Sequence, residues 1–189
     1  MTQRVLLLTG TCGVGKSSVA QEWAQRHESA VIAGDAITDF VAHAPFEPYT
    51  GDEQKLVGEL AAEAATEFVQ RGMSVVVEWV LYPGTIRRLR NRLRKRMKRR
   101  DKSLQVCAVW LTADRLTNHQ RDKSREASVW MNERVDIVAD ELEQLRWPRY
   151  VHRLDTSNLD VNATVDRIDA LCWRWVLMPP GHPEAQAAL

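Results

Sequence analysis

The residues best suited to chemistry form a glycine-rich run near the start of the chain, Gly10-Thr11-Cys12-Gly13-Val14-Gly15-Lys16-Ser17. The run has the full G-x-x-x-x-G-K-[ST] spacing of a phosphate-binding loop. Its glycines let successive backbone N–H groups converge on one point, and the following helix presents its positive dipole end there. We expect this run and Ser18 to bind a nucleoside triphosphate, with Lys16 on the β and γ phosphates and Ser17 on Mg²⁺.

The residues on either side of the loop support this interpretation. The apolar run Val5 to Leu8 precedes the loop, and a helical pattern from Val19 to Ala24 follows it. A strand, the loop and then a helix is the setting that the motif requires. The alternative is a glycine-rich turn, but a chance match in a chain of 189 residues is roughly a one in a hundred event or rarer.

Two acidic residues end later strand-like runs. Asp35 follows the run 30–34, and Glu78 closes the β-branched run 74–77. Open α/β sheets bind ligands at the carboxyl ends of their strands, so we expect both acids beside the loop. Asp35 is the candidate to take the proton of an acceptor hydroxyl, with the alternative of a helix N-cap. Glu78 has either a role in the site or a local structural hydrogen bond.

Three arginines complete the candidate site. Arg121 and Arg125 lie in a polar segment that we expect to form a lid over approximately 119–130. Either of them could cover the γ-phosphate, since phosphoryl transfer depends mainly on positioning and charge neutralisation. The alternative is that both are solvated helix charges. Arg87, early in the helix after Tyr82-Pro83, is a candidate for contact with a polar or anionic acceptor.

The elements that must position these residues follow from hydrophobic periodicity. Strand-like runs alternate with helical stripes along the chain, which predicts a five-stranded parallel sheet with helices on both faces. The last strand, 149–154, alternates as an edge strand does, and Gly72 is expected to cap the helix 52–71. The stretch 40–51 should cap the substrate. We expect one domain over 1–178 and a disordered tail over 179–189.

The charge of the chain is concentrated in one helix. Eleven of the 26 Lys and Arg residues lie between Arg87 and Lys102, where Asp101 is the single acid. The apolar residues Ile86, Leu89, Leu93 and Met97 form one stripe along this helix. The basic residues are therefore expected to be its solvated face. The alternative is a surface that binds nucleic acid.

Cysteine usage and hydropathy restrict the class of protein. The three cysteines, Cys12, Cys107 and Cys172, lie far apart without a C-x-x-C pair, which argues against both a disulfide framework and a zinc site. Modification of the Cys12 thiol should matter, because Cys12 lies within the phosphate loop. No apolar stretch has the length of a signal peptide or a membrane span. We expect a cytoplasmic protein.

Missing motifs narrow the kinds of nucleotide-binding protein. The chain has no N-K-x-D motif and no D-x-x-G switch after the loop, which argues against a GTPase, and it is short for an ATPase core with its partner elements. It resembles the small-molecule kinases of the P-loop superfamily, such as chloramphenicol phosphotransferase, shikimate kinase and gluconate kinase. The resemblance rests on the loop, Asp35, the run Val75 to Glu78, the two lid arginines, and Asp155-Thr156-Ser157-Asn158.

The resemblance implies a fold and a set of residue roles. The fold is a three-layer α/β P-loop kinase fold with a five-stranded parallel sheet and a short lid. Asp35 would contact the acceptor hydroxyl, a lid arginine would lie on the phosphates, and the loop with Asp155, Thr156 and Ser157 would contact adenine. Glu78 departs from the usual Walker aspartate, which leaves open whether it orients Mg²⁺ through water or binds the acceptor.

These observations lead to one expected function and three alternatives. We expect an ATP- and Mg²⁺-dependent transfer of the γ-phosphate to a hydroxyl of a small molecule, either a metabolite or an antibiotic-like compound. The first alternative is a nucleoside or nucleotide kinase. The second, from another class, is an ATP-binding module that binds nucleic acid through the basic helix 86–100. The third is an inactive relative. A monomer or homodimer without a membrane partner is expected.

Overall fold

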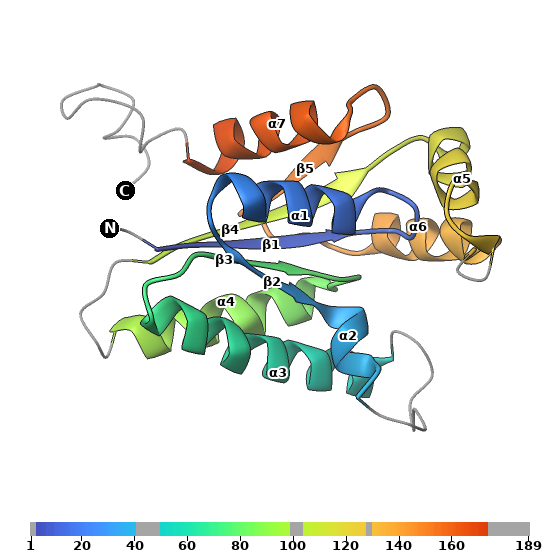
Figure 1. Cartoon of the computed structure of the whole chain (residues 1–189). Coiled ribbons are helices and arrows are strands. Elements are labelled where there is room, and N and C mark those ends of the chain that lie inside the picture. Colours follow the sequence, from blue (N-terminus) through green and yellow to red (C-terminus); the bar gives the residue numbers. More distant parts are fainter. Residues whose placement is uncertain (1–2, 41–49, 99–103, 128–129, 174–189) are drawn as a thin grey trace.

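The computed structural model describes residues 3–40, 50–98, 104–127 and 130–173. Within these ranges a five-stranded sheet forms the middle layer and helices cover both of its faces (Figure 1). The strands are β1 (Gln3–Gly10), β2 (Ala30–Ala33), β3 (Val75–Glu78), β4 (Leu104–Thr112) and β5 (Val151–Asp155). They are all parallel and lie in the order β2-β3-β1-β4-β5, so the predicted sheet and the predicted edge position of β5 are confirmed.

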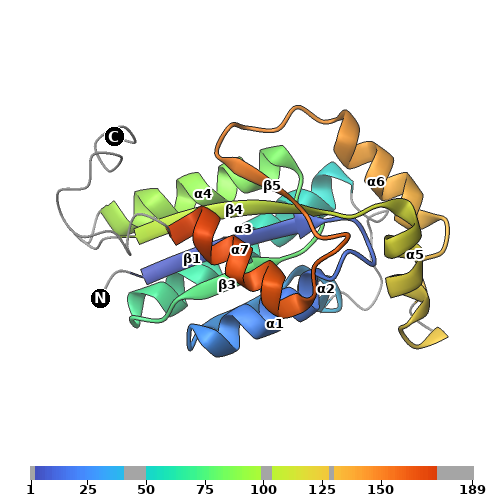
Figure 2. The same cartoon turned by 90° about the horizontal axis from the view of Figure 1, so that it is seen from above.

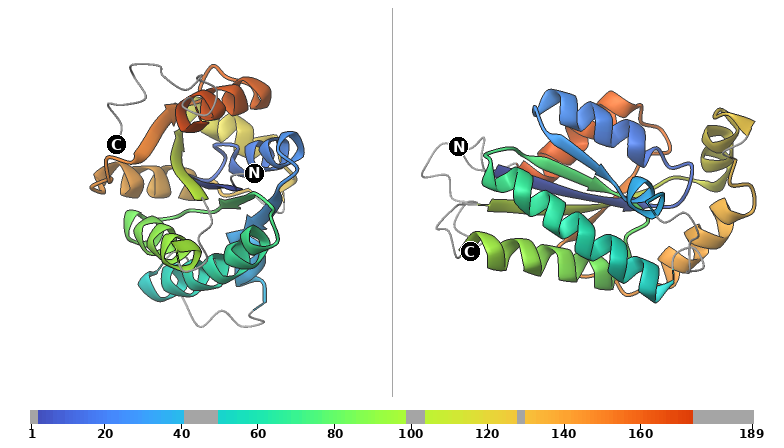
Figure 3. Two further views of the ribbon diagram at one scale, coloured as in Figure 1. Left: turned by 90° about the vertical axis from the view of Figure 1, so that its left-hand side faces the viewer. Right: turned by 60° about the horizontal axis from the view of Figure 1, so that its bottom comes forward.

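Alternating side chains of β1 build two cores. Val5 and Leu7 pack with residues of α3 (Gly51–Gln70) and α4 (Pro83–Lys98) on one face of the sheet. Leu6 and Leu8 pack with α1 (Lys16–Arg26) and α7 (Val161–Trp173) on the other face. Figure 3 shows these helix pairs on opposite sides of the sheet. All four β1 side chains are fully buried, as expected for the central strand of a parallel sheet.

Local sequence signals explain where several helices begin and end. The Thr50 side chain accepts a hydrogen bond from the Glu53 N–H and caps α3. Gly72 follows that helix with φ of +89°, a conformation that glycine adopts without steric cost. Asp114 caps α5 (Arg115–Lys123) by accepting from the Thr117 N–H at 2.9 Å. Helix α3 therefore begins one residue before the predicted helix 52–71.

The carboxyl ends of three strands bring the predicted site residues to one edge of the sheet. The phosphate loop follows β1, Asp35 lies in α2 (Gly34–Thr38) directly after β2, and Glu78 ends β3. In the sheet register Glu78 pairs with Leu8 of β1 and with Ala33 of β2. Helices α5 and α6 (Arg134–Gln144) lie at this same end of the molecule (Figure 2).

The prediction that the cysteines form no disulfide is wrong. Cys107 in the interior of β4 and Cys172 in the last turn of α7 are joined by a disulfide, with 5.6 Å between their Cα atoms. The two residues are 65 positions apart in the sequence, and only the packing of α7 against β4 brings them together. The remaining cysteine, Cys12, is not part of a disulfide and is buried in the phosphate loop.

Some predictions concern residues outside the described ranges. These are the disordered tail over 179–189 and most of the substrate cap over 40–51. In the part of the chain that the structure describes, no helix combines the length and the apolar composition needed to cross a membrane.

Candidate functional site

The phosphate loop has the backbone conformation that its glycines allow. Gly15 has φ of +97° and stands at the N-cap of α1, and Gly13 has φ of +76°. A Cβ atom at Gly13 would lie 2.6 Å from the Asn118 carbonyl oxygen of α5. A side chain at this position would therefore push the loop away from α5, and the same contact places α5 directly against the loop.

Lys16 hydrogen bonds within the loop, and Ser17 links the loop to β3. Lys16 Nζ donates to the Thr11 carbonyl oxygen at 3.0 Å, and Ser17 Oγ donates to Glu78 Oε1 at 3.0 Å. Glu78 is only 5% exposed, and its burial raises the pKa of the carboxyl group. The positive charge of Lys16 and the Ser17 hydrogen bond act in the opposite direction on that pKa, while the negative charge of Asp35 raises it further.

Asp35 lies at the same edge, but it is not a helix cap. The N-cap of α2 is Ala33, and no side chain caps this helix. The Asp35 residue is exposed, and its Oδ1 accepts a hydrogen bond of 2.9 Å from the indole Nε1 of Trp79. The alternative role as an N-cap is therefore wrong, and the carboxylate is held by a residue that follows β3.

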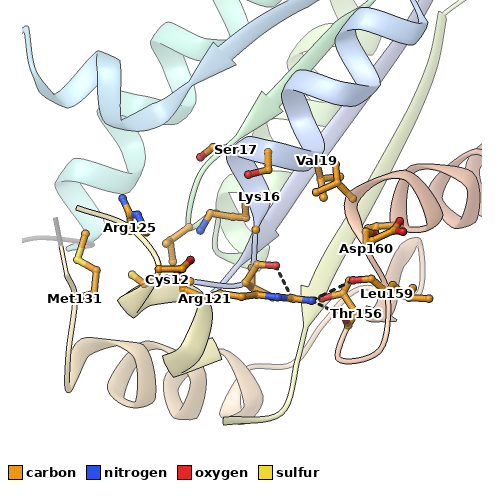
Figure 4. A pocket seen from close by; sticks show the side chains of 18 of the residues that line it. Cys12, Lys16, Ser17, Val19, Arg121, Arg125, Met131, Thr156, Leu159 and Asp160 are labelled. Carbon is orange, nitrogen blue, oxygen red and sulfur yellow. Dashed lines mark hydrogen bonds between the residues drawn. The ribbon is translucent and has the colours of Figure 1, made fainter. Parts of the chain in front are cut away.

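Lys16, Ser17 and Asp35 line a cavity of about 460 Å³ (Figure 4). Glu78 does not belong to its lining. The phosphate loop contributes 12–17, with Ser18 and Val19 from α1, and Asp35, Trp79 and Val80 come from the ends of β2 and β3. The segment after β5 and the first turn of α7 supply Thr156, Leu159, Asp160, Val161 and Thr164. Helix α5 and the chain after it supply Arg121, Ser124, Arg125 and Met131. One cavity therefore contains residues 12–18 of the expected triphosphate site and the expected proton acceptor, Asp35.

The Arg121 side chain connects α5 to the phosphate loop and to the loop before α7. Its guanidinium donates to the Val14 carbonyl oxygen at 3.2 Å, to Thr156 Oγ1 at 3.0 Å, to the Thr156 carbonyl oxygen at 2.8 Å and to the Leu159 carbonyl oxygen at 3.2 Å. Figure 4 shows this side chain extended between the phosphate loop and the loop before α7. The guanidinium therefore already hydrogen bonds to carbonyl and hydroxyl groups of the protein, on the side of the cavity where Leu159 lies.

Arg125 has a different environment. Its side chain is 43% exposed, and its guanidinium Nη1 lies 3.5 Å from Oδ1 of the buried Asp122. The other oxygen of Asp122 accepts from the backbone N–H groups of Met131 and Asn132 at 2.9 and 3.1 Å. The Trp130 indole donates to the Arg125 carbonyl oxygen at 3.0 Å. Hydrogen bonds from Trp130, Met131 and Asn132 thus hold the segment that contains Arg125, while its guanidinium stays partly exposed.

Several predicted site residues do not line the cavity. Arg87 is exposed on α4, and Asp155 and Ser157 hydrogen bond with each other beside Asp114. These two hydrogen bonds lower the pKa of the Asp155 carboxyl group. Gly10 and Thr11 also lie outside the lining, and Thr11 Oγ1 donates to the Val135 carbonyl oxygen of α6 at 2.8 Å. Of the predicted adenine-contacting residues, Thr156 alone lines the cavity.

Several residues that line the cavity are not among those predicted from the sequence. Trp79 directly follows Glu78, so its position at a strand end was a usable signal. Leu159, Asp160 and Thr164 lie three to eight residues after Thr156, and no motif in the sequence assigned them to the site. Met131 has no sequence signal, because its position depends on the hydrogen bond of its backbone N–H to Asp122.

The oxygen atoms around Ser17 fit Mg²⁺. In phosphate sites Mg²⁺ keeps several waters and takes one or two carboxylates together with phosphate oxygens. Ser17 Oγ and the Glu78 carboxylate lie 3.0 Å apart, and both are hard oxygen donors. Among the described residues no group of three or more His, Cys, Asp or Glu side chains could hold a metal by itself. A Mg²⁺ ion that takes part of its ligands from a bound triphosphate does not need such a group.

Comparisons with known proteins agree with the loop and the sheet. The sequence profile of the AAA domain family matches residues 5–147. No curated protein sequence matches the chain. A gluconokinase structure from Sinorhizobium meliloti 1021 has 21% identity and a TM-score of 0.64, covering 90% of this chain and 91% of that one.

Two further solved structures have a similar likeness. The APS kinase of Mycobacterium tuberculosis, in complex with AMPPNP and APS, has 18% identity and a TM-score of 0.61, covering 90% of this chain and 97% of that one. The tunicamycin resistance protein of Deinococcus radiodurans has 18% identity and a TM-score of 0.60, covering 89% and 94%. At these identities the likeness concerns the fold alone.

Proposed function

Because the chain belongs to the AAA domain family and has the α/β fold of P-loop kinases, we propose that it is a cytoplasmic, ATP-dependent phosphotransferase. It moves the γ-phosphate to a hydroxyl group of a small molecule, either a metabolite or an antibiotic-like compound. The observation that carries this proposal is the shared cavity, in which Lys16, Ser17 and Asp35 lie together. A gluconokinase, an APS kinase and a tunicamycin resistance protein are among the proteins of similar fold.

The reaction assigns one role to each side of the cavity. The acceptor oxygen attacks the γ-phosphorus, the bond from that phosphorus to the β–γ bridging oxygen breaks, and ADP leaves with the electron pair. The hydroxyl proton passes to the Asp35 carboxylate. Lys16 leaves its contact with the Thr11 carbonyl oxygen and binds the phosphates, and the exposed guanidinium of Arg125 covers the γ-phosphate.

Ser17 and Glu78 would hold Mg²⁺ on the donor side. The ion would neutralise charge on the β and γ phosphates and orient them for the transfer. The Ser17 hydroxyl would bind the ion directly, and the Glu78 carboxylate would hold a water of its shell. Since Glu78 Oε1 already accepts a hydrogen bond from Ser17 Oγ, the two groups stand close enough to serve one ion.

An ADP-release assay with a panel of acceptors tests the proposed function. The panel contains gluconate, APS, tunicamycin, nucleosides and nucleoside monophosphates. Lys16→Met should abolish turnover while the circular dichroism spectrum and melting temperature stay near those of the wild type. Asp35→Asn should bind ATP normally and lose transfer by a factor of at least tens. Retained turnover in Lys16→Met, or an unchanged rate in Asp35→Asn, would remove the assigned roles.

The same panel separates the proposed function from a nucleoside or nucleotide kinase. The proposal expects turnover with the hydroxyl compounds that are not nucleosides. Turnover confined to nucleosides or nucleoside monophosphates would favour the alternative.

The contacts of α4 argue against the alternative of nucleic-acid binding. Arg92 and Arg96 pair with Glu63 of α3, and the Arg90 guanidinium lies 4.2 Å from the centre of the Tyr150 ring. These basic groups stabilise the packing of the helix and are not all available to phosphates. Gel-shift measurements with single- and double-stranded DNA and RNA at two salt concentrations test the alternative, and we expect no shift even at low salt.

A further inference from the structure

The indole of Trp79 hydrogen bonds to Asp35, the proposed proton acceptor. Trp79 is 2% exposed and belongs to the core that contains Ile37 and Leu81. Its backbone N–H donates to the Leu8 carbonyl oxygen at 3.2 Å, which ties it to β1 two residues before the phosphate loop. The indole is therefore a fixed part of the fold, although its Nε1 reaches a carboxylate that is exposed.

Gly34 makes room for this indole. A Cβ atom at Gly34 would lie 2.2 Å from Cγ of Trp79, far inside the closest approach of two carbon atoms. The residue beside Asp35 therefore lacks a side chain where the Trp79 ring packs against α2. Two neighbouring positions, Gly34 and Asp35, are both fitted to the same ring, one by its absent Cβ and one by its hydrogen bond.

The hydrogen bond uses one carboxylate oxygen and leaves the other. Oδ1 of Asp35 accepts from Trp79 Nε1, and no donor from the described part of the chain reaches Oδ2. A carboxylate on a short helix has two side-chain torsions to fix, and one N–H donor held by a packed core limits both.

We infer that Trp79 is the positioning residue for Asp35: its indole N–H orients the carboxylate so that Oδ2 receives the proton of the acceptor hydroxyl. This inference rests on the proposed phosphotransferase function. It assigns Trp79 no contact with the reacting atoms. Removal of the N–H should therefore lower kcat through Asp35, by about tenfold to a hundredfold, because small misplacements of a catalytic group cost up to about this much. The KM for ATP should change by less than about twofold.

Kinetics of Trp79→Phe test the inference in two backgrounds, with the panel compound that gives the highest ADP release. We expect the substitution to lower kcat in the wild type and to have no further effect in Asp35→Asn. Gly34→Ala, which displaces the ring without removing it, should give the same loss. Trp110→Phe is the matched control, since the Trp110 ring is also buried but stacks on Trp147 at 4.6 Å. An equal loss in both backgrounds would mean a structural role and overturn the inference.

A spectroscopic test requires no acceptor and separates this inference from the proposed function. The chain has seven tryptophans, so the indole N–H signal that Trp79→Phe removes from a ¹H–¹⁵N spectrum identifies Trp79. We expect Asp35→Asn to shift this indole signal and to leave that of Trp110 in place. An unmoved Trp79 signal would overturn the contact even if phosphate transfer is found. A shifted signal in a protein without transfer activity would instead reject the proposed function.

Discussion

Replacement of Arg121 by Met tests whether this arginine supports the nucleotide pocket or covers the γ-phosphate. The substitution keeps an unbranched chain but removes the guanidinium that donates to Val14, Thr156 and Leu159. These three partners belong to the phosphate loop and to the loop before α7. We expect Arg121→Met to loosen both loops, lower the free energy of unfolding and weaken ATP binding.

The size of the effect follows from the hydrogen bonds. A hydrogen bond to a charged group contributes about 1.5–3 kcal/mol, and four such bonds from one guanidinium do not add fully. Losses above about 4 kcal/mol for one substitution are rare, so we expect about 3 kcal/mol. For a chain of 189 residues this corresponds to a fall in melting temperature of roughly 6–12 °C.

Urea denaturation and calorimetric titration with a non-hydrolysable ATP analogue measure the two effects. Arg125→Met is the matched control, because its guanidinium is 43% exposed and has one partner in the described part of the chain, Asp122. The control should unfold within about 1 kcal/mol of the wild type and lose kcat. One result would refute the structural role of Arg121: Arg121→Met keeps the stability and analogue affinity of the wild type and loses only kcat, while Arg125→Met keeps its rate.

Two further predictions concern the buried acid and the disulfide. Burial raises the pKa of Glu78 above its ordinary value of 4.5. Above pH 4.5 the folded protein therefore binds more protons at this group than the unfolded chain does. The contribution of Glu78 to stability is lost as the pH rises through the raised pKa. Glu78→Gln should therefore melt above the wild type at pH 8 without nucleotide, by a margin that shrinks toward pH 4.5; a margin independent of pH would contradict this. Reduction of the Cys107–Cys172 bond, which spans 65 residues, should lower the unfolding free energy by up to about 4 kcal/mol, and thiol titration of the unreduced, denatured chain should count Cys12 alone.

Local sequence patterns carry most of the fold. The loop motif, the β-branched run at β3 and the stripe Ile86, Leu89 and Leu93 each depend on residues close together in the chain. The three stripe residues are all buried, as the helical spacing predicts. The positions of Asp35 and Glu78 at strand ends follow from the same reasoning, because parallel strands bring their carboxyl ends to one edge.

Contacts between distant residues account for what the sequence could not reveal. Arg121 is 35 residues from Thr156, and the guanidinium has to cross from α5 to the loop before α7 to reach it. Cys107 and Cys172 meet because alternate residues of β4 face α7. No periodicity or spacing encodes such a pair, so the sequence showed that Arg121 was a candidate but not which partners it has.

The two acids at the sheet edge differ in environment, and this difference assigns them different roles. Asp35 is exposed and held through one oxygen, so its other oxygen can exchange a proton with a substrate that enters and leaves. Glu78 is buried and hydrogen bonded to Ser17, the residue expected at the metal. Environment commonly separates two carboxylates in this way. We therefore infer that Glu78 serves the donor side, so that Glu78→Gln should weaken the stabilisation by Mg²⁺ and ATP together, and Asp35→Asn should leave it intact.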